Sequence, residues 1–316
     1  MSEMLNHRAY QLVDAILPRV GDLRGTLIEH DNGGCVVDLG VKAEGGLESG
    51  RLMAEVCLAG LGQVRIVPGE VAGVTWPHVQ IVTDSPIEAC LLSQYAGWQI
   101  SVGKFFAIGS GPMRAAAARE ELFEKLDYRE SSNHAIGVLE TSKLPTDGVF
   151  TLISEKTGVP VDRTILLTAR TASIAGNLQV VARSVETSLH KLFELGFDVW
   201  RVRSAVGVAP LPPVAADDVA GIGRTNDAIL YGGRVTLMLR GDDESIAAIG
   251  SKVPSSGSAA HGKPFGEIFE DAGRDFYKID PLLFSPAEVV FQNLDTGRVH
   301  RFGRIAPEVM QRSFGL

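Results

Sequence analysis

The sequence predicts an α/β fold of the α+β type, with two mixed α/β domains and a substrate pocket between them. With 316 residues the chain exceeds the length at which a single core usually keeps growing, so two domains of roughly 150 residues are expected. Short strand-like stretches alternate with helical ones. The 35 glycines exceed the usual share of roughly 7%. Such an excess indicates tight turns and close backbone approaches, as in a ligand site built from loops.

The N-terminal part alternates between helical and extended patterns. Positions 3–17 carry apolar residues at helical spacing, and Pro18 ends that helix. A second helix is expected at 47–59. The stretches expected to form strands of one sheet are 26–28, 35–39, 64–66 and 79–83.

The middle of the chain carries clear start and stop signals. Asp84-Ser85-Pro86 opens a helix that Gly97 can end. A buried strand or strand pair is expected at 98–108, and an alanine-rich helix at 113–126. The region 130–160 is rich in turn residues. It marks a soft boundary between a first α/β domain, 1–135, and a second, 136–316, and the two domains are free to interleave.

The most regular helical pattern spans 173–195. Its apolar stripe consists of Ile174, Leu178, Val181, Val185, Leu189 and Leu192. Gln179, Arg183, Glu186 and His190 recur on a neighbouring face. Such a row can present an acid/base group to a cleft. Periodicity alone favours a solvated face with an Arg–Glu pair worth about 0.2–0.5 kcal/mol.

Further elements of the second half are less regular. Short strands are expected at 165–167 and 235–239. The proline-rich stretch 209–213 must be extended, because proline cannot continue a helix. Residues 250–264, rich in Gly, Ser and Pro, form a long loop.

Gly109-Ser110-Gly111-Pro112 lies between an expected strand and an expected helix. Backbone N–H groups at such a junction favour a phosphate or a carboxylate. The segment lacks the Lys-Ser/Thr of a P-loop and the full GxGxxG of a dinucleotide fold, so a tight turn explains it equally well. Lys104 and Arg114 are the nearby cations that a phosphate-binding protein would use.

Two other segments combine aromatic and polar residues. Positions 221–227, with Asn226 and Asp227, are followed by Tyr231 and offer hydrogen-bonding groups and a stacking surface to a heteroaromatic ring. A capped helix with a glycine stop explains the same residues. Gln94 and Tyr95 likewise belong either to a pocket wall or to a helix end.

Composition narrows the class of ligand and the compartment. A net charge of −8 argues against nucleic acid as a partner, because nucleic acid is bound by clustered Lys and Arg. The negative charge suits a cationic ligand, although a need for solubility also explains an acidic protein. No signal peptide and no run of 18 apolar residues is found, so no membrane partner is expected. The three cysteines and seven histidines have no disulfide or metal-ligand spacing, which favours a reducing cytoplasm.

Several long blocks occur in an order typical of one family. As they stand here they are GGLESGRLMAEVCLAGLG, DSPIEACLLSQYAGWQI, KFFAIGSGPMRA, TASIAGNLQVVARSVET, and GVAPLPP followed by GIGRTNDAILYGG. With these blocks the chain resembles the methenyltetrahydromethanopterin cyclohydrolases. It departs from the family pattern at Thr83, where Ser is expected, and at Met113, where a smaller residue is expected. Neither position touches the Arg/Glu pair.

The resemblance implies a reaction and an assembly. Water adds to the cationic methenyl carbon of N5,N10-methenyltetrahydromethanopterin, and the ring opens to the N5-formyl product. The pterin carrier is the substrate, and no metal or organic cofactor is implied. The family's paired Arg and Glu match Arg183 and Glu186, so Glu186 is expected to be the acid/base and Arg183 to orient it. A homotrimer is implied as well.

The expected substrate-binding residues come from the family blocks and the segments described above. They are Gln94, Tyr95, Lys104, Ser110, Gly111, Gln179, Asn226, Asp227 and Tyr231. Two alternatives stay open. One is a pterin-binding protein without turnover, in which Arg183 and Glu186 are an idle ion pair. The other is a phosphate-binding transferase that uses the turn 109–112.

Overall fold

The computed structural model describes residues 4–275 and 278–316 and divides the chain into two compact units. The first consists of Met1–Gly62 and Glu88–Gln179, and the second of Gln63–Ile87 and Val180–Leu316. Each unit contains one sheet with helices packed on it, which confirms the predicted α/β fold of two domains. The boundary predicted near position 135 lies inside strand β7 (Ala135–Glu140) of the first unit, and the units alternate along the chain.

The first unit is built around a six-stranded mixed sheet. In spatial order its strands are β1 (Thr26–Glu29), β2 (Cys35–Gly40), β8 (Thr164–Ala169), β7, β6 (Phe105–Ser110) and β5 (Trp98–Val102). The three central strands β2, β8 and β7 run parallel, and the outer pairs are antiparallel. Every residue of β8 is buried, as expected for a parallel strand covered on both faces.

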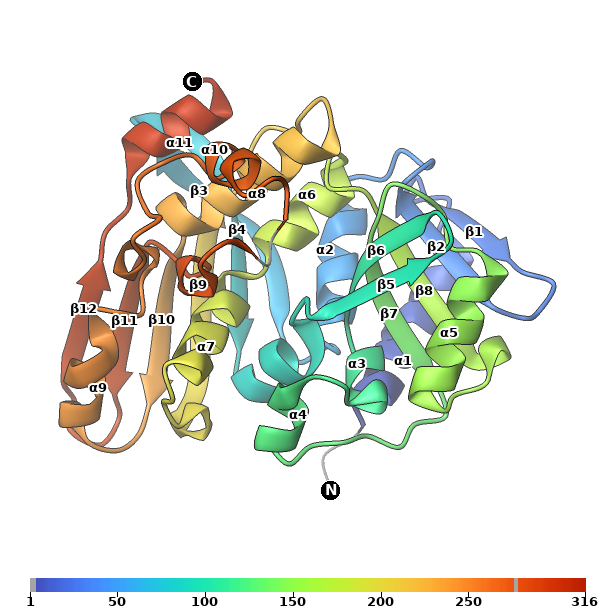
Figure 1. Cartoon of the computed structure of the whole chain (residues 1–316), viewed down its shortest axis with the longest axis horizontal. Helices are drawn as coiled ribbons and strands as arrows, with labels where there is room; N and C mark the ends of the chain where they lie inside the picture. Colours follow the sequence, from blue (N-terminus) through green and yellow to red (C-terminus); the bar gives the residue numbers. More distant parts are fainter. Residues whose placement is uncertain (1–3, 276–277) are drawn as a thin grey trace. The chain divides into compact units, whose positions relative to one another are not determined.

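Helices cover both faces of this sheet (Figure 1). Helices α1 (Leu5–Ile16) and α2 (Leu47–Cys57) pack on the side of Ile136 and Val138. Helices α3 (Met113–Ala117) and α5 (Asp147–Thr157) pack on the side of Ala135 and Leu139. The helix predicted at 3–17 is therefore confirmed as α1, except that position 3 lies outside the described residues.

The second unit has its own six-stranded sheet, which is mostly antiparallel. In spatial order its strands are β12 (Val299–Gly303), β11 (Glu288–Asn293), β10 (Arg234–Leu239), β9 (Val202–Pro210), β4 (Val74–Thr83) and β3 (Gln63–Val71). Strands β10 and β11 run parallel. Buried and half-exposed residues alternate along β9 and β10, which is typical of a sheet with one well-covered face.

One topological prediction is wrong. The strands expected at 64–66 and 79–83 are β3 and β4 of the second sheet. There β3 pairs with β4 and β4 pairs with β9, so neither pairs with β1 or β2. The alternation of apolar and polar residues indicates a strand and its buried face. It carries no information about which distant segment supplies the partner strand.

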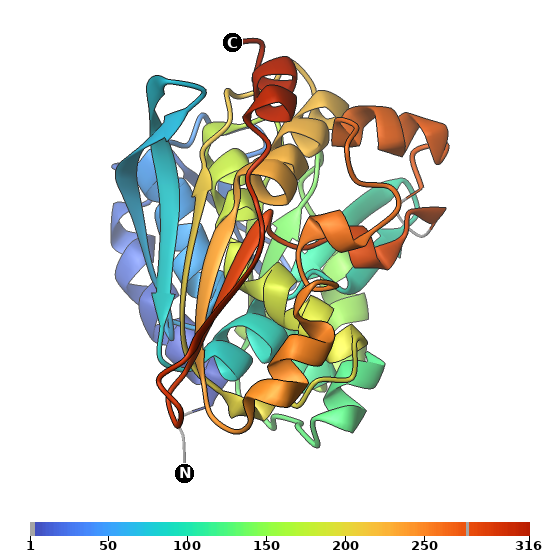
Figure 2. The same cartoon turned by 90° about the vertical axis from the view of Figure 1, so that its left-hand side faces the viewer.

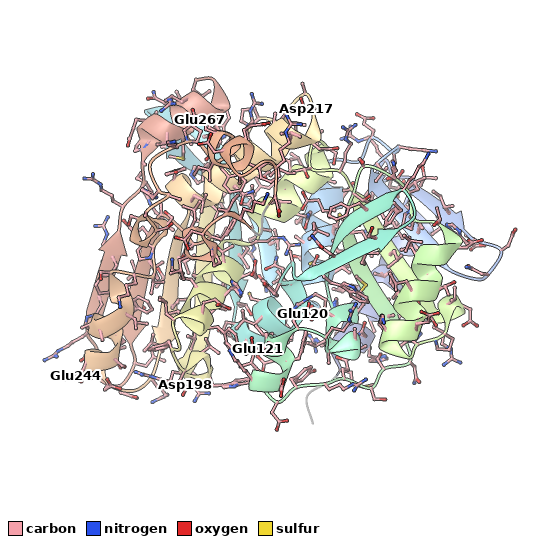
Figure 3. The ribbon with its side chains drawn as sticks, in the orientation of Figure 1. Glu120, Glu121, Asp198, Asp217, Glu244 and Glu267 are labelled. Carbon is pink, nitrogen blue, oxygen red and sulfur yellow. The ribbon has the colours of Figure 1, made fainter. Side chains whose placement is uncertain are left out.

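Helices of the second unit pack on its sheet and on one another (Figure 2). They are α7 (Ser184–Glu194), α8 (Asp218–Gly232), α9 (Asp243–Gly250), α10 (Phe265–Asp271) and α11 (Pro307–Phe314). Helix α7 packs on β9 and β10, and α8 packs on β9, α10 and α11. Asp217, labelled in Figure 3, caps α8 by accepting a hydrogen bond of 2.9 Å from the Ala220 N–H.

Two helices that were predicted as continuous are interrupted. The alanine-rich helix expected at 113–126 is divided into α3 and α4 (Glu121–Lys125), because Ala118 adopts a left-handed conformation with φ 43°. The helix expected at 173–195 is divided into α6 (Ile174–Val181) and α7. Arg183 stands between them with φ −104° and ψ 9°. Neither break contains glycine or proline, so the residue types and the apolar periodicity gave no sign that these helices are interrupted.

The helix predicted from Asp84 to Gly97 is present but differs in type. Residues Ile87–Gln94 form a π-helix, and the Tyr95 N–H donates to the Cys90 carbonyl at 2.8 Å. This bond spans five residues, as a π-helical bond does, and π-helical turns are frequent at functional sites. In the described part of the chain no helix is both long and apolar enough to cross a membrane.

Candidate active site

Arg183 and Glu186 lie at the start of helix α7. Arg183 is the N-cap residue, and Glu186 is the third residue of the first turn. A carboxylate at this position is stabilised by the positive end of the helix dipole and by the nearby backbone N–H groups. The break at Arg183 thus creates a helix N-terminus at the place where the sequence pattern suggested the middle of a helix.

Glycine in strand β9 lets this helix start lie close to the sheet. A Cβ atom at Gly207 would overlap the Ser184 hydroxyl oxygen and would lie 2.7 Å from Val185 Cγ2. Both neighbours belong to the first turn of α7. The position of Glu186 in the second unit therefore depends on a strand residue that has no side chain.

Burial argues against a solvated polar face on this segment. The exposed fractions are 1% for Gln179, 7% for Arg183 and 4% for Glu186. Charged residues are almost never buried to this degree unless they are paired or functional. Gln179 lies near the end of α6, where the chain passes from the first unit to the second. The predicted apolar stripe is confirmed, since five of its six residues are buried and Ile174 is half-buried.

In the first unit the structure brings together the π-helix end and the glycine turn. The Gly111 N–H donates to the Ser93 carbonyl at 2.9 Å, which places Gly111 beside Gln94 and Tyr95. Ser110, the last residue of β6, donates its hydroxyl to the Val138 carbonyl at 3.2 Å. Four of the predicted substrate-binding residues are thus neighbours.

A buried cysteine joins the same two segments. Cys57 Sγ lies 3.3 Å from Ser110 Oγ. The Cys57 carbonyl accepts a hydrogen bond of 2.6 Å from the Ser93 hydroxyl. Both contacts connect the end of α2 with the π-helix and β6. We name the residues Cys57, Gln94, Tyr95, Ser110 and Gly111, together with Ser93, the glycine-turn cluster.

Lys104 is separated from this cluster. It occupies the turn between β5 and β6 and is exposed, whereas Ser110 and Gly111 follow the opposite end of β6. Six residues of strand span roughly 20 Å. The Lys104 carbonyl accepts a hydrogen bond of 2.9 Å from Lys143 Nζ. Lys104 is therefore too far away to hold a phosphate at the glycine turn. Arg114, the other cation considered for a phosphate site, is not available either, because it is buried and paired with Glu120 at 2.8 Å.

Helix α8 carries the other predicted ligand-binding side chains. The segment 221–227 lies inside this helix, which ends at glycine as the helical interpretation predicted. The capped start lies earlier than predicted, because Asp217 is the N-cap. Asn226 Nδ2 donates to the Ile222 carbonyl at 2.8 Å. The Tyr231 hydroxyl donates to the Lys263 carbonyl at 2.5 Å. Tyr231 thereby fastens the predicted long loop 250–264, which also contains the short 3₁₀-helix Ser255–Gly257, to α8.

Asp227 is a buried carboxyl group next to Tyr231 on the same helix. It accepts a hydrogen bond of 2.7 Å from the Phe265 N–H. Burial raises the pKa of Asp227 to about 7, although hydrogen bonds from Ser313 and Phe265 lower it in part. Burial also raises the pKa of the Tyr231 hydroxyl. The Asp227 carboxyl group and the Tyr231 hydroxyl thus bind backbone groups of Phe265 and Lys263 in the second unit.

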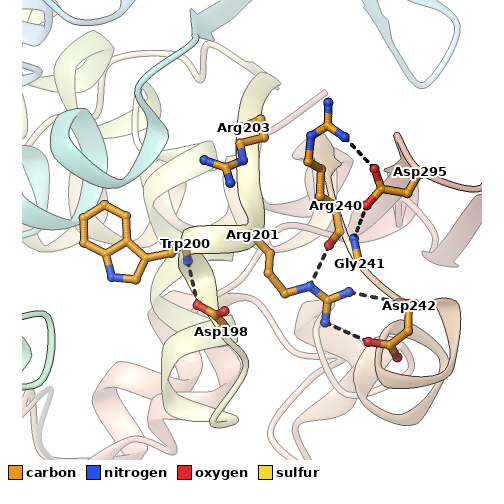
Figure 4. Close-up of a pocket in the computed structure, with 8 residues that line it drawn as sticks. All are labelled: Asp198, Trp200, Arg201, Arg203, Arg240, Gly241, Asp242 and Asp295. Atoms are coloured by element: carbon orange, nitrogen blue, oxygen red, sulfur yellow. Dashed lines mark hydrogen bonds and ion pairs between the residues drawn. The ribbon is translucent and has the colours of Figure 1, made fainter.

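A pocket of about 480 Å³ lies at one end of the second sheet (Figure 4). Two of its cations are neutralised, because Arg201 lies 3.4 Å from Asp242 and Arg240 lies 2.6 Å from Asp295. None of the predicted site residues lines it. Among the residues that the structure describes, no group of three or more His, Cys, Asp or Glu side chains is arranged to hold a metal ion.

Comparison with known proteins identifies the family. Residues 4–314 match the family model described as Cyclohydrolase (MCH). The chain belongs to this family. The methenyltetrahydromethanopterin cyclohydrolase of Rhodopirellula baltica is 48% identical over 90% of this chain and 87% of its own. The enzyme of the same name from Methylobacillus flagellatus is 42% identical over 98% and 95%, and that from Methanosarcina barkeri 39% over 99% and 98%.

Membership in the cyclohydrolase family confirms the resemblance drawn from the sequence blocks and places the chain among the hydrolases of one-carbon metabolism. The sequence patterns did not point to Ser93, Cys57 or Gly207, and they suggested Arg114 only as a cation for a phosphate and not as a buried partner of the π-helix. Only Gly207 carried a usable signal, since glycine within a strand often marks a close approach of another backbone. The other three are recognisable only from their contacts.

Proposed function

We propose that this chain catalyses the reversible hydrolysis of N5,N10-methenyltetrahydromethanopterin to N5-formyltetrahydromethanopterin. The observation that carries the proposal is the buried Glu186 carboxylate in the first turn of α7, next to the N-cap Arg183, in a chain of the cyclohydrolase family. The relatives named above carry this activity in their names. A buried anion suits a substrate whose reacting carbon lies between two nitrogens that share a positive charge.

Glu186 acts as base and then as acid in this proposal. When water adds to the methenyl carbon, a C–O bond forms and the carboxylate accepts one water proton. When the ring opens, the bond between that carbon and N10 breaks. The electron pair goes to N10, which takes the proton from Glu186. The hydroxyl proton leaves to solvent as the formyl C=O forms, so one proton is released per turnover.

Arg183 orients the carboxylate and balances its charge. A guanidinium group presents N–H donors in a fixed plane, which restrains the rotation of a neighbouring carboxylate. Because the substrate is already a cation, the methenyl carbon is electrophilic without a Lewis acid. The proposal therefore includes neither a metal nor an organic cofactor. The pterin itself is the carrier.

The proposed pterin-binding residues fall into two groups. Gln94, Tyr95, Ser110 and Gly111 of the glycine-turn cluster supply polar groups and a ring in the first unit, and Gln179 extends this set. Asn226, Asp227 and Tyr231 on α8 of the second unit form the other proposed group. Lys104 lies roughly 20 Å from the glycine turn, so it can contact only a distant part of a ligand bound at that turn.

We also propose a cytoplasmic homotrimer. Three cysteines without a disulfide suit a reducing compartment. The family resemblance implies the trimer, and the half-exposed apolar residues on one face of the second sheet, such as Val206, Val208 and Met238, suit contact with another copy. Sedimentation velocity tests the assembly, with a mass about three times 33.8 kDa expected. A species at the mass of one chain contradicts it.

Replacement of Glu186 tests the catalytic assignment. Glu186→Gln keeps the volume and removes both the charge and the proton carrier, so kcat should fall by about 10²–10⁴-fold. The rate is followed as the loss of near-ultraviolet absorption of the methenyl substrate. Glu194→Gln at the end of the same helix is the matched control, because Glu194 is exposed and pairs with His190 at 3.5 Å. The control should retain wild-type turnover.

Two outcomes would reject parts of the proposal. Near-normal turnover of folded Glu186→Gln removes Glu186 from the proton path. A wild-type protein that binds the methenyl substrate without accelerating its loss is a binding protein and not an enzyme. The transferase alternative has lost its support, because α3 has only five residues and the Gly111 N–H already donates to Ser93.

A further inference from the structure

A fully buried arginine lies behind the glycine-turn cluster. Arg114 on α3 is 0% exposed. Its Nε donates to Glu120 Oε1 at 2.8 Å, and its Nη1 donates to the carbonyl oxygens of Leu91 and Ser93 at 3.2 and 3.3 Å. A guanidinium group withdrawn from water needs such partners, because burying an unpaired charge is very costly.

The two carbonyl groups belong to the last turn of the π-helix Ile87–Gln94. Carbonyl groups at a helix end have no partner within the helix, and a cation there also complements the helix dipole. The Ser93 carbonyl accepts a second hydrogen bond from the Gly111 N–H. Arg114 therefore joins the π-helix end, which carries Gln94 and Tyr95, to the glycine turn.

Arg114 also contacts the aromatic ring of the cluster. Its Cζ lies 4.8 Å from the centre of the Tyr95 ring and 5.1 Å from that of Phe123. A guanidinium over a ring face attracts it through the ring quadrupole, and the attraction is stronger in a desolvated place. Tyr95 is half-buried, so the guanidinium holds its inner surface while part of the ring is accessible.

Two backbone features bring Glu120 to this arginine. In one continuous helix, residues six apart point to different sides. The left-handed conformation of Ala118 breaks the helix and returns the chain, so that Glu120, labelled in Figure 3, faces Arg114. Gly97 removes an obstacle, since a Cβ atom there would lie 2.5 Å from the Tyr95 ring and 3.0 Å from Glu120 Oε1.

We propose that Arg114, held by Glu120, is a positioning residue that fixes the Gln94–Tyr95 segment and the Tyr95 ring for substrate binding. This inference rests on the proposed function. Stability alone gives little reason for such a residue, because replacing a buried ion pair by apolar groups of similar volume is often neutral or stabilising. The arginine instead determines where the carbonyl groups and the ring lie.

Kinetics test the inference with three variants and one control. Arg114→Met removes the charge and the fork of donors, Arg114→Lys keeps the charge alone, and Glu120→Gln removes the charge of the partner. Arg119→Met is the matched control, because Arg119 is exposed and lies 5.8 Å from the Trp98 ring centre.

The KM for the methenyl substrate should rise about tenfold in Arg114→Met and less in Arg114→Lys, with kcat within about twofold, because binding contacts and not the chemical step are lost. Glu120→Gln should raise KM in the same direction. Arg119→Met should match the wild type. An unchanged KM in folded Arg114→Met overturns the inference. If that variant does not fold, an unchanged KM in Glu120→Gln overturns it.

A fluorine signal reports the ring itself. The chain has five tyrosines, so 3-fluorotyrosine labelling gives a small set of ¹⁹F resonances, and Tyr95→Phe assigns the one of interest. That resonance should shift or broaden in Arg114→Met while the other four stay in place. A raised KM with an unmoved Tyr95 resonance rejects positioning of the ring. If the wild type does not consume the methenyl substrate, the proposed function fails, yet the Tyr95 resonance still decides whether Arg114 fixes the ring.

Discussion

Each of the two sheets has a glycine in a central strand against which a helix start packs, and the two contacts differ in stiffness. In the first unit, a Cβ atom at Gly137 of β7 would overlap the Met113 sulfur and lie 2.9 Å from its methyl carbon. In the second unit, a Cβ atom at Gly207 of β9 would overlap the Ser184 hydroxyl and lie 2.7 Å from Val185 Cγ2.

The two contacts differ in how easily the side chains next to the glycine can be displaced. Methionine is unbranched and flexible, so the end of Met113 can be displaced at low cost. Ser184 and Val185 are short side chains on the first turn of α7, and they can yield only if the helix start moves with them. Because Arg183 and Glu186 belong to the same helix start, the second contact links packing to these two residues, whereas the first contact does not involve them.

The largest expected effect is that of Gly207→Ala. The added methyl group should push the first turn of α7 away from β9 and lower the free energy of unfolding by about 2–3 kcal/mol. Because Glu186 moves with that turn, kcat should fall at least about tenfold. Urea unfolding and steady-state turnover of the methenyl substrate measure the two effects. If the free energy of unfolding falls while kcat is unchanged, the packing of α7 on Gly207 does not determine how Glu186 acts.

The buried Asp227 on α8 of the second unit should make the free energy of unfolding depend on pH. Its pKa is raised from 3.8 to about 7 by burial, so the folded state holds a proton that the unfolded chain releases near pH 4. The stabilisation is fully present below about pH 4 and is lost as the pH rises through 7.

Asp227→Asn, which cannot ionise, should therefore gain stability relative to the wild type between pH 5 and pH 8, by about 2–3 kcal/mol. Urea unfolding at pH 5, 6, 7 and 8 gives the difference at each pH. Parallel curves for the two proteins would show that Asp227 ionises in the folded state as it does in the unfolded chain.

The smallest effect is expected for Gly137→Ala. Since the end of the Met113 side chain can rotate away, the loss should be about 1 kcal/mol, with kcat within about twofold of the wild type. The measurements are those used for Gly207→Ala. Equal losses of kcat in the two variants would contradict the view that only the second contact reaches Arg183 and Glu186.

Sequence patterns identified most elements but not their interruptions. The apolar stripe from Ile174 to Leu192 is buried as predicted, except that Ile174 is half-buried, because helical periodicity reports directly on the side that packs. The break at Arg183 and the left-handed Ala118 were not predictable, since both positions carry residues that favour continued helix. Tertiary packing overrides such local preferences. The partner of β4 was missed for a similar reason, because alternation does not name a partner strand.

The sequence by itself determined the family, the residue types of the candidate site and the faces that are buried, because ordered blocks and periodicity are properties of the chain alone. Only the tertiary structure placed Glu186 in the first turn of a helix, packed that turn on Gly207 and enclosed Arg114 between the π-helix and Glu120. These facts depend on contacts between segments that lie between 6 and 23 positions apart in sequence. Such contacts form only when the whole chain packs, so no local pattern can encode them.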